Sequence, residues 1–197
     1  MSESWLLSNW IEIAGAVISL IYLYFSIKQR ILLWPFGVMS ALFYILIYFQ
    51  NKLYADMGLQ VYYVVISIYG WMVWSRKSEL SGKRNLNISH ISLFQTIMLI
   101  VVFIILSGIF NWILIEFTDS DVPFWDAITT AGGVVATWML ARKYIEHWLF
   151  WVLLNIISIG LYIYKGLYPT TILFAVYTTM ALVGYRTWKK LLNDQSS

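Results

Sequence analysis

The stretch ISLFQTIMLIVVFIILSGIFNWILI, residues 91–115, is an apolar run that contains no charged side chain. A helix needs about 20 residues to cross roughly 30 Å of hydrocarbon, so this run is long enough to span a membrane. Six other runs approach or reach that length and are continuous rather than alternating, which predicts helices instead of barrel strands. The seven predicted spans are residues 10–27, 31–49, 55–74, 91–115, 124–141, 148–164 and 168–188.

The composition supports an all-α membrane protein. Of the 197 residues, 60% are hydrophobic and 12% are charged, and the mean hydropathy is +0.72. Soluble domains are roughly 45–50% apolar, so a soluble or disordered chain is excluded. The absence of cysteine and the presence of only two histidines predict no metal and no cofactor. The lipid bilayer, not nucleic acid, is the partner that this composition predicts for a chain with a net charge of +3.

The distribution of cations predicts the orientation. Eleven of the 13 Lys and Arg residues fall on one set of alternate loops, and only Lys52 and Lys165 fall on the other. The positive-inside rule then predicts an external N-terminus and a cytoplasmic C-terminus. No basic region precedes the first span, so we expect it to be retained. Tryptophans near the span ends are predicted to form an interfacial belt. They are Trp10, Trp34, Trp74, Trp112, Trp148 and Trp188.

An internal repeat appears when the chain is aligned with itself at an offset of 114 residues. Rare residue types then coincide without a gap, including Trp34 with Trp148, Gly70 with Gly184, Trp74 with Trp188, and Tyr63 with Tyr177. We predict a single transmembrane domain over residues 1–197, with repeat one at 8–76, a linker helix at 91–115 and repeat two at 122–190. The linker adds one crossing, so the repeats are parallel. Transporters with such repeats bind substrate near the midplane.

Two polar and aromatic stripes are the candidate binding residues. Gln60, Tyr63 and Ser67 share one face of the third span, and Tyr177 is the repeat partner of Tyr63. Trp148, Trp151 and Asn155 share one face of the sixth span. An amide in hydrocarbon costs several kcal/mol unless it is paired, so Gln60 and Asn155 either join helices or bind a ligand. For Ser67, the alternative is a bond to the carbonyl four residues earlier.

Three acids lie near the predicted external ends of the first, third and fifth spans: Glu12, Asp56 and Asp126. As entrance acids they would attract a cationic solute, and the alternative is that they complement helix dipoles. His147 is predicted to be interfacial and His90 to be a solvated loop residue. No nucleophile elbow, zinc motif or phosphate loop is present, which predicts that the protein is not an enzyme and has no catalytic residues.

Several segments together resemble the PnuC-type vitamin transporters. They are LYADMGLQVYYVVISIYGWMVW (53–74), PFWDAITT (123–130), RKYIEHWLFWVLLNIISIGLYIYKGLY (142–168) and VGYRTW (183–188). The resemblance implies a 3+1+3 bundle similar to the SWEET architecture, in a bacterial inner membrane. It also implies facilitated diffusion of a vitamin that a cytoplasmic kinase traps by phosphorylation. Ligand contacts are implied at Gln60, Trp148, Trp151 and Asn155, and the oligomeric state, including a homo-oligomer, stays open.

Three departures bear on the substrate. Nicotinamide riboside carriers of this family often have Asn where this chain has Ser40, Ser67 and Val183. The departures and the seven-helix core look more like the thiamine-associated PnuT branch. Thiamine is therefore the predicted substrate, and nicotinamide riboside is the alternative. Riboflavin, which is associated with another branch, is not distinguished from them. Either of the first two is a cation that aromatic walls would bind.

Overall fold

The computed structural model describes residues 17–50, 54–76 and 86–196. These residues form seven helices, which confirms the all-α prediction. The first is described over Val17–Ile27. The others are α2 (Leu33–Gln50), α3 (Tyr54–Ser75), α4 (Leu93–Phe117), α5 (Pro123–Ala141), α6 (His147–Tyr164) and α7 (Tyr168–Ser196). The described helix ends fall within a few residues of the predicted ones, except that α7 continues to Ser196.

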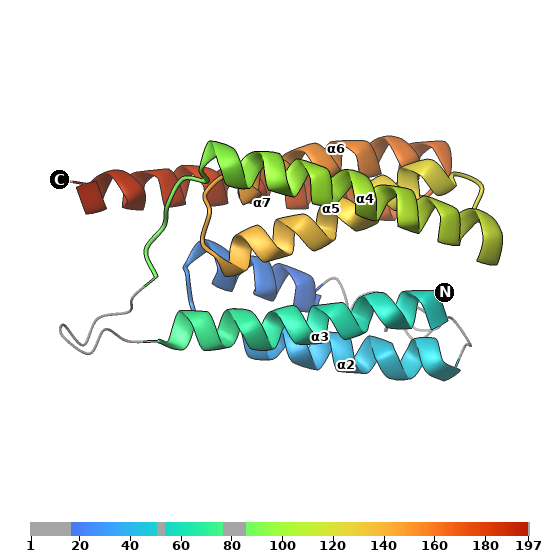
Figure 1. The fold of residues 1–197 in the computed structure, drawn as a ribbon, viewed down its shortest axis with the longest axis horizontal. Helices are drawn as coiled ribbons and strands as arrows, with labels where there is room; N and C mark the ends of the chain where they lie inside the picture. Colours follow the sequence, from blue (N-terminus) through green and yellow to red (C-terminus); the bar gives the residue numbers. More distant parts are fainter. Residues whose placement is uncertain (1–16, 51–53, 77–85, 197) are drawn as a thin grey trace, which may run out of the picture. The chain divides into compact units, whose positions relative to one another are not determined.

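The chain divides into two compact units, Met1–Arg84 and Asn85–Ser197. In the first unit α2 and α3 pack side by side, and in the second α4, α5, α6 and α7 each pack against the next helix along the chain (Figure 1). Met57–Ser75, Leu93–Phe117 and His147–Tyr164 are long and apolar enough to cross a membrane. Their apolar residues form helices because hydrocarbon offers no other partner for the backbone polar groups.

Local sequence signals set the helix starts in the second unit. Ser92 and Gln95 form a capping box at the start of α4, in which each side chain accepts from the backbone of the other. Pro123 begins α5, where its missing N–H costs nothing. Every residue of α4 keeps some exposed surface, as suits a helix that faces lipid on most sides.

The turn before α2 uses a left-handed residue that is not glycine. Gln29 has φ 49°. The N–H of Gln29 donates to the Ser26 carbonyl at 3.0 Å, and the N–H of Arg30 donates to the Phe25 carbonyl at 2.8 Å. These two bonds form a Schellman motif, which satisfies the last carbonyls of the preceding helix.

The turn before α6 repeats this geometry 114 positions later. Lys143 has φ 55°. The N–H of Lys143 donates to the Leu140 carbonyl at 2.9 Å, and that of Tyr144 donates to the Met139 carbonyl at 3.1 Å. Each donor and acceptor residue of this turn therefore lies 114 positions after its counterpart in the turn before α2, and we call such residues offset partners. Among the described residues, Gln29 and Lys143 are the only non-glycine residues with positive φ.

A buried tryptophan joins α2 to α3 in the first unit. Trp34 is fully enclosed, and its ring lies so close to Gly70 that a Cβ on Gly70 would be 2.3 Å from a ring atom. Its ring centroid is 5.4 Å from that of Trp74, with the two planes at 90°. Glycine at position 70 is what lets the indole lie directly on the α3 backbone.

The second unit packs α6 on α7 in the same way. A Cβ on Gly184 would lie 2.6 Å from the Trp148 ring, and the Trp148 and Trp188 centroids are 5.7 Å apart at 88°. The interfacial belt prediction is wrong for Trp34, Trp74, Trp148 and Trp188, all at most 1% exposed, because these rings fill helix contacts. Trp112 is 58% exposed, as a belt residue would be, and Trp10 lies outside the described residues.

Candidate functional site

The predicted stripe on α3 lies where three helices of the first unit meet. Ser67 is buried, whereas Gln60 and Tyr63 are half-buried. The Ser67 Oγ would lie 2.8 Å from a Cβ placed on Gly37 of α2, and a ring carbon of Tyr22 would lie 3.5 Å from it. Gly37 thus leaves room for a serine from α3 and a tyrosine from the Val17–Ile27 helix.

Sequence reasoning missed Tyr22. A ring carbon of Tyr22 lies beside the same Gly37 position as the Ser67 hydroxyl, so Tyr22 lines the same helix contact as Ser67. The Tyr62 and Tyr63 ring centroids are 5.6 Å apart. No signal singled out Tyr22, because its offset partner is Ala136 and it stands in a run rich in other aromatic residues.

The predicted stripe on α6 contains the most deeply buried amide of the candidate set. Asn155 is 5% exposed, and Ser158 continues the same buried face. Trp151, one turn before Asn155, is half-buried. Next to Asn155, Leu154 packs onto α5 so closely that a Cβ on Gly132 would lie 2.3 Å from a Leu154 methyl. Asn155 is therefore a polar group held inside an apolar helix, as the sequence predicted.

Trp148 lies one turn from Trp151 but in a closed aromatic cluster. Its centroid is 4.5 Å from His147, which is 4.9 Å from Trp188. His147 Nδ1 lies 2.7 Å from the Tyr144 carbonyl, which assigns the proton to Nδ1 and leaves Nε2 as an acceptor. The interfacial prediction for His147 is wrong, because the ring is fully enclosed. Neither His147 Nε2 nor Trp148 Nε1 finds a partner among the described residues.

The predicted entrance acids are described only in part. Asp126 lies in the first turn of α5, where its charge also complements the helix dipole. It is not a free acid, because its Oδ2 lies 3.7 Å from Lys165 Nζ. Glu12 and the side chain of Asp56 lie outside the described residues. Tyr177 is half-buried on α7, with its ring centroid 5.3 Å from that of Phe174.

The segment before α4 docks on the turn between α5 and α6. Ser89 pairs with this turn as a short parallel bridge. Its N–H donates to the Lys143 carbonyl at 3.2 Å, and its carbonyl accepts from the Ile145 N–H at 3.1 Å. Ile88 is buried beside it. The residues just before α4 are therefore an ordered brace of the second unit.

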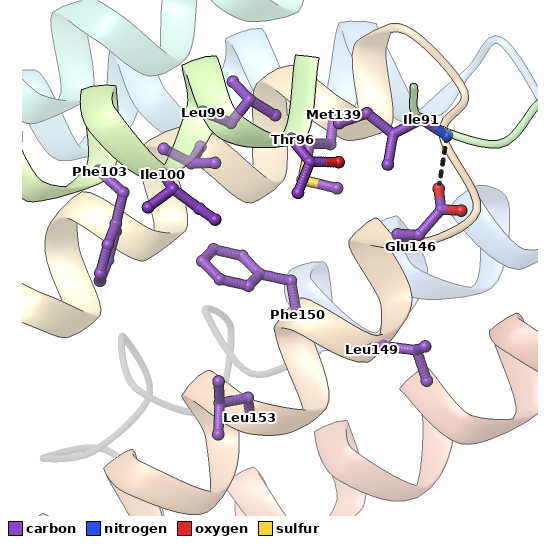
Figure 2. Close-up of a pocket in the computed structure, with 11 residues that line it drawn as sticks. Ile91, Thr96, Leu99, Ile100, Phe103, Met139, Glu146, Leu149, Phe150 and Leu153 are labelled. Atoms are coloured by element: carbon purple, nitrogen blue, oxygen red, sulfur yellow. Dashed lines mark hydrogen bonds between the residues drawn. The ribbon is translucent and has the colours of Figure 1, made fainter. Parts of the chain in front are cut away.

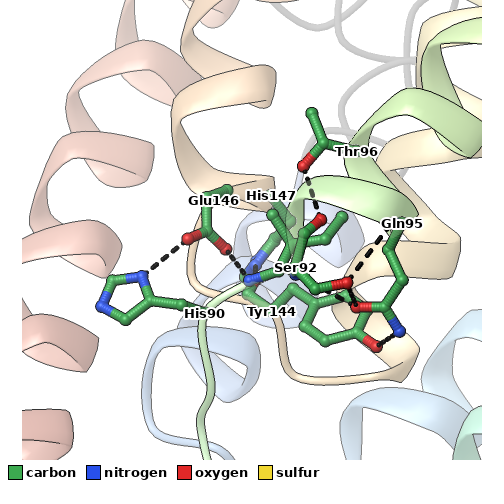
Figure 3. Close-up of polar contacts among 8 residues, drawn as sticks. His90, Ser92, Gln95, Thr96, Tyr144, Glu146 and His147 are labelled. Carbon is green, nitrogen blue, oxygen red and sulfur yellow. Dashed lines mark hydrogen bonds and ion pairs between the residues drawn. The ribbon is translucent and has the colours of Figure 1, made fainter.

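Side chains complete the brace (Figure 3). Glu146 Oε1 lies 2.7 Å from His90 Nδ1, while Oε2 accepts from the Ile91 N–H at 3.1 Å. Gln95 Nε2 donates to the Tyr144 hydroxyl at 2.7 Å. His90 is 70% exposed, which agrees with its predicted solvation, but the sequence did not reveal its pairing with Glu146, 56 positions away.

A cavity of about 460 Å³ lies between α4, α5 and α6 (Figure 2). Its lining is apolar except for Thr96 and Glu146, and includes Phe103 and Phe150, whose ring centroids are 5.9 Å apart. None of the predicted substrate contacts lines this cavity. Because it offers few polar partners, it is a poor binding site for a polar vitamin cation.

Comparison with known proteins identifies relatives over nearly the whole chain. The sequence matches the family described as "Nicotinamide mononucleotide transporter" over residues 9–190. It is 26% identical to the nicotinamide riboside transporter PnuC of Escherichia coli (strain K12), over 96% of this chain and 89% of the relative. A protein with the same name from Neisseria mucosa is 22% identical over 95% of this chain and 75% of its own.

Two further similarities bear on substrate and fold. The riboflavin/roseoflavin transporter RibM of Streptomyces davaonensis is 21% identical, over 91% of this chain and 84% of the relative. The crystal structure described as that of the vitamin B3 transporter PnuC superposes with a TM-score of 0.72 at 22% identity, covering 94% of this chain and 83% of that one. The seven helices therefore adopt the fold of a solved transporter, and the names of these relatives do not include thiamine.

Proposed function

The chain belongs to the nicotinamide mononucleotide transporter family, and we propose that it carries nicotinamide riboside across a bacterial inner membrane. It is a multi-pass membrane transporter and not an enzyme, as its relatives are named. The observation that carries the substrate proposal is the buried Asn155 on α6. Its amide can both donate and accept, which matches the carboxamide and hydroxyls of a nicotinamide riboside.

The remaining predicted contacts complete this proposal. In the first unit Gln60, Tyr63 and Ser67 supply an amide and two hydroxyls on one face of α3. In the second unit Trp151 and Tyr177 supply aromatic faces for a cationic ring. Trp148 stays a predicted contact, although its indole is enclosed here by His147 and Trp188 and would reach a ligand only after α6 and α7 repack.

Thiamine is the second candidate substrate. Ser67 stands where nicotinamide riboside carriers often have Asn, and it is buried close to Gly37, where a longer amide side chain would need more room. Nicotinamide riboside takes precedence over thiamine because relatives with that substrate in their names align with nearly the whole chain. This order corrects the one that the serine and valine departures predicted.

We further propose facilitated diffusion by a parallel 3+1+3 repeat. The matched turns at Gln29 and Lys143, and the matched packing of Trp34 and Trp148, support two copies of a three-helix unit. Because α4 adds one crossing between the copies, both would have the same orientation, with the N-terminus outside and the C-terminus in the cytoplasm. A cytoplasmic kinase would make uptake effectively one-way by phosphorylating the vitamin.

Binding measurements test the substrate and the site together. The detergent-purified protein is titrated with nicotinamide riboside and with thiamine, with quenching of tryptophan fluorescence as the signal. We expect saturable riboside binding that weakens at least tenfold in Asn155→Ala, a change of about 1.4 kcal/mol. Asn193→Ala, which removes an exposed amide from α7, is the matched control and should bind normally. Binding of thiamine alone would reverse the order of the two candidates, and binding of neither would overturn the proposal.

A flux experiment tests the mechanism. In proteoliposomes without a kinase, riboside should enter only until its internal and external concentrations are equal. Addition of a riboside kinase and ATP to the lumen should then allow label to accumulate. Concentrative uptake without the kinase, abolished by collapsing a proton gradient, would contradict facilitated diffusion.

A further inference from the structure

The cavity between α4, α5 and α6 has no part in the proposed transport function. All of its described lining residues belong to the second unit, and its volume is about 460 Å³. A dry apolar cavity of about 150 Å³ is large enough to hold benzene, so this one has room for a long alkyl chain. Three lining side chains, Ile100, Leu149 and Leu153, are about half exposed, so the cavity is an open groove and not a sealed void.

The groove follows α4 and α6 from the ends at which these helices begin. Its lining extends from Ile91 to Phe103 along α4 and from Glu146 to Leu153 along α6 (Figure 2). Phe103 stands ten residues after Leu93, the first residue of α4, a rise of about 15 Å at 1.5 Å per residue. One leaflet is half of a hydrocarbon core of roughly 30 Å. The groove is therefore as deep as the layer that one acyl chain fills.

The two ends of the groove differ in chemistry. Its polar residues, Glu146 and Thr96, lie at the end where the two helices begin, and the Thr96 hydroxyl is already bonded to the Ser92 carbonyl at 3.0 Å. The Glu146 side chain is 29% exposed, and its carboxylate contacts His90 Nδ1 and the Ile91 N–H. A carboxylate offers about four acceptor positions, so it can accept from a further donor while both contacts persist. The groove thus joins an anionic mouth to an apolar interior.

We propose that this groove binds one phospholipid whose headgroup carries a primary ammonium group, as in phosphatidylethanolamine. One acyl chain lies along the groove as far as Phe103 and Leu153, and the ammonium group donates to the Glu146 carboxylate. Because α4 and α6 are long and apolar enough to cross a membrane, lipid is the molecule that surrounds the open side of the groove. An anionic headgroup would meet a like charge at the mouth. The inference goes beyond vitamin transport and does not depend on the substrate.

Native mass spectrometry of the full-length protein tests the headgroup. The protein in detergent is equilibrated with equal amounts of phosphatidylethanolamine and phosphatidylglycerol that carry the same acyl chains, and the lipids that stay bound are identified by mass. We expect the unaltered protein to prefer the ammonium lipid roughly threefold, as suits a partly exposed ion pair. Glu146→Gln should abolish this preference while a lipid still binds. Equal retention of the two lipids by the unaltered protein would overturn the proposed headgroup.

A substitution that fills the groove tests the site of the acyl chain. Leu153→Trp should lower the retention of both lipids about tenfold, because the bulkier ring takes the place of apolar contacts with the chain. Ile156→Trp is the matched control, since Ile156 also lies on α6, has 55% exposure against 53% for Leu153, and is absent from the lining. It should retain lipid as the unaltered protein does.

Two outcomes would overturn the groove as a lipid site. The first is unchanged retention in Leu153→Trp, or an equal loss in Ile156→Trp. The second is a change in the number of protein copies in the Leu153→Trp complex with lipid retention unaltered, because the groove would then be a contact between copies of the chain. Near-UV circular dichroism of each variant establishes that a loss of lipid does not reflect a loss of fold.

Discussion

The turn and helix start at residues 26–37 and those at 140–151 have the same backbone but different side-chain chemistry. Both turns place a non-glycine residue at positive φ, and both following helices lay a tryptophan on a glycine. Some offset partners differ in side-chain type: Leu33 corresponds to His147, and Gly37 corresponds to Trp151. The backbone geometry of these two segments is the same, whereas positions 147 and 151 carry aromatic side chains where positions 33 and 37 do not.

The buried face of α6 also carries a polar side chain at a position where the buried face of α2 carries an apolar one. Ala41 and its offset partner Asn155 are both buried, at 2% and 5% exposure. A methyl group suffices to fill that position in the first unit, so packing alone does not require an amide there. This contrast is why we propose Asn155 as a ligand contact rather than a residue needed for helix packing.

Substitution of the two contact glycines should give the largest effects. Gly70→Ala and Gly184→Ala place a Cβ 2.3 and 2.6 Å from buried indole atoms, which cannot move freely. Each should lower stability by about 1–3 kcal/mol, as overpacked cores do. Thermal unfolding of the purified protein, followed by near-UV circular dichroism, would measure the loss.

Matched glycines provide the control for that prediction. Gly58 on α3 and Gly160 on α6 have nothing within 4 Å of an added Cβ, so alanine should be neutral or stabilising there. A large loss at only one of positions 70 and 184 would break the equivalence of the two units. Equal losses at all four positions would show that helix glycines matter for reasons other than tryptophan packing.

Exchange of the side chains at positions 33 and 147 should give the next largest effect. Leu33→His buries imidazole nitrogens in a fully enclosed site and should cost about 1–3 kcal/mol. His147→Leu removes an Nε2 that is buried without a partner, along with the Nδ1 bond to Tyr144, so its effect should stay within about 1 kcal/mol. Unfolding midpoints of the two variants test this asymmetry. A larger loss in His147→Leu than in Leu33→His would show that the imidazole has a partner on which stability depends.

Spans were predictable from sequence because hydrocarbon length and continuous hydrophobicity act locally. The match between Trp34 and Trp148 could also be predicted. Their position near the span ends suggested the membrane–water interface. The structure instead buries both rings, because they lie within contacts between helices. The pairing of Glu146 with His90 was not predictable, because it depends on how residues 86–92 fold back onto a distant turn. Positive φ at Gln29 and Lys143 was hidden too, since glycine is the usual signal for that geometry.

Loss of the hydrogen bond between Gln95 and Tyr144, which braces the turn before α6, should have an intermediate effect on stability. Gln95 donates to the Tyr144 hydroxyl, and the offset partner of Tyr144 is Arg30, which has no phenol. In a double-mutant cycle with Gln95→Leu and Tyr144→Phe, we expect a coupling of about 0.5–1.5 kcal/mol, typical of one partly buried hydrogen bond. Chemical denaturation of the four proteins would supply the cycle. A coupling near zero would mean that the backbone bridge at Ser89 holds the brace without this bond.

Removal of the ionic part of the brace should give the smallest effect. Glu146→Gln keeps an oxygen that can accept from the Ile91 N–H but loses the charge that faces His90. Because the His90 side chain is 70% exposed, the pair is screened, and we expect a loss of about 0.2–1 kcal/mol that shrinks as salt is added. Glu146→Leu removes the acceptor as well and should cost more, since it leaves the Ile91 N–H, in a part-buried site, without its partner. If Glu146→Gln destabilised the protein as much as Glu146→Leu, the ionic contact would outweigh the backbone bond, and the second turn would depend on charge in a way that the first turn, with Leu32 at the offset position, does not.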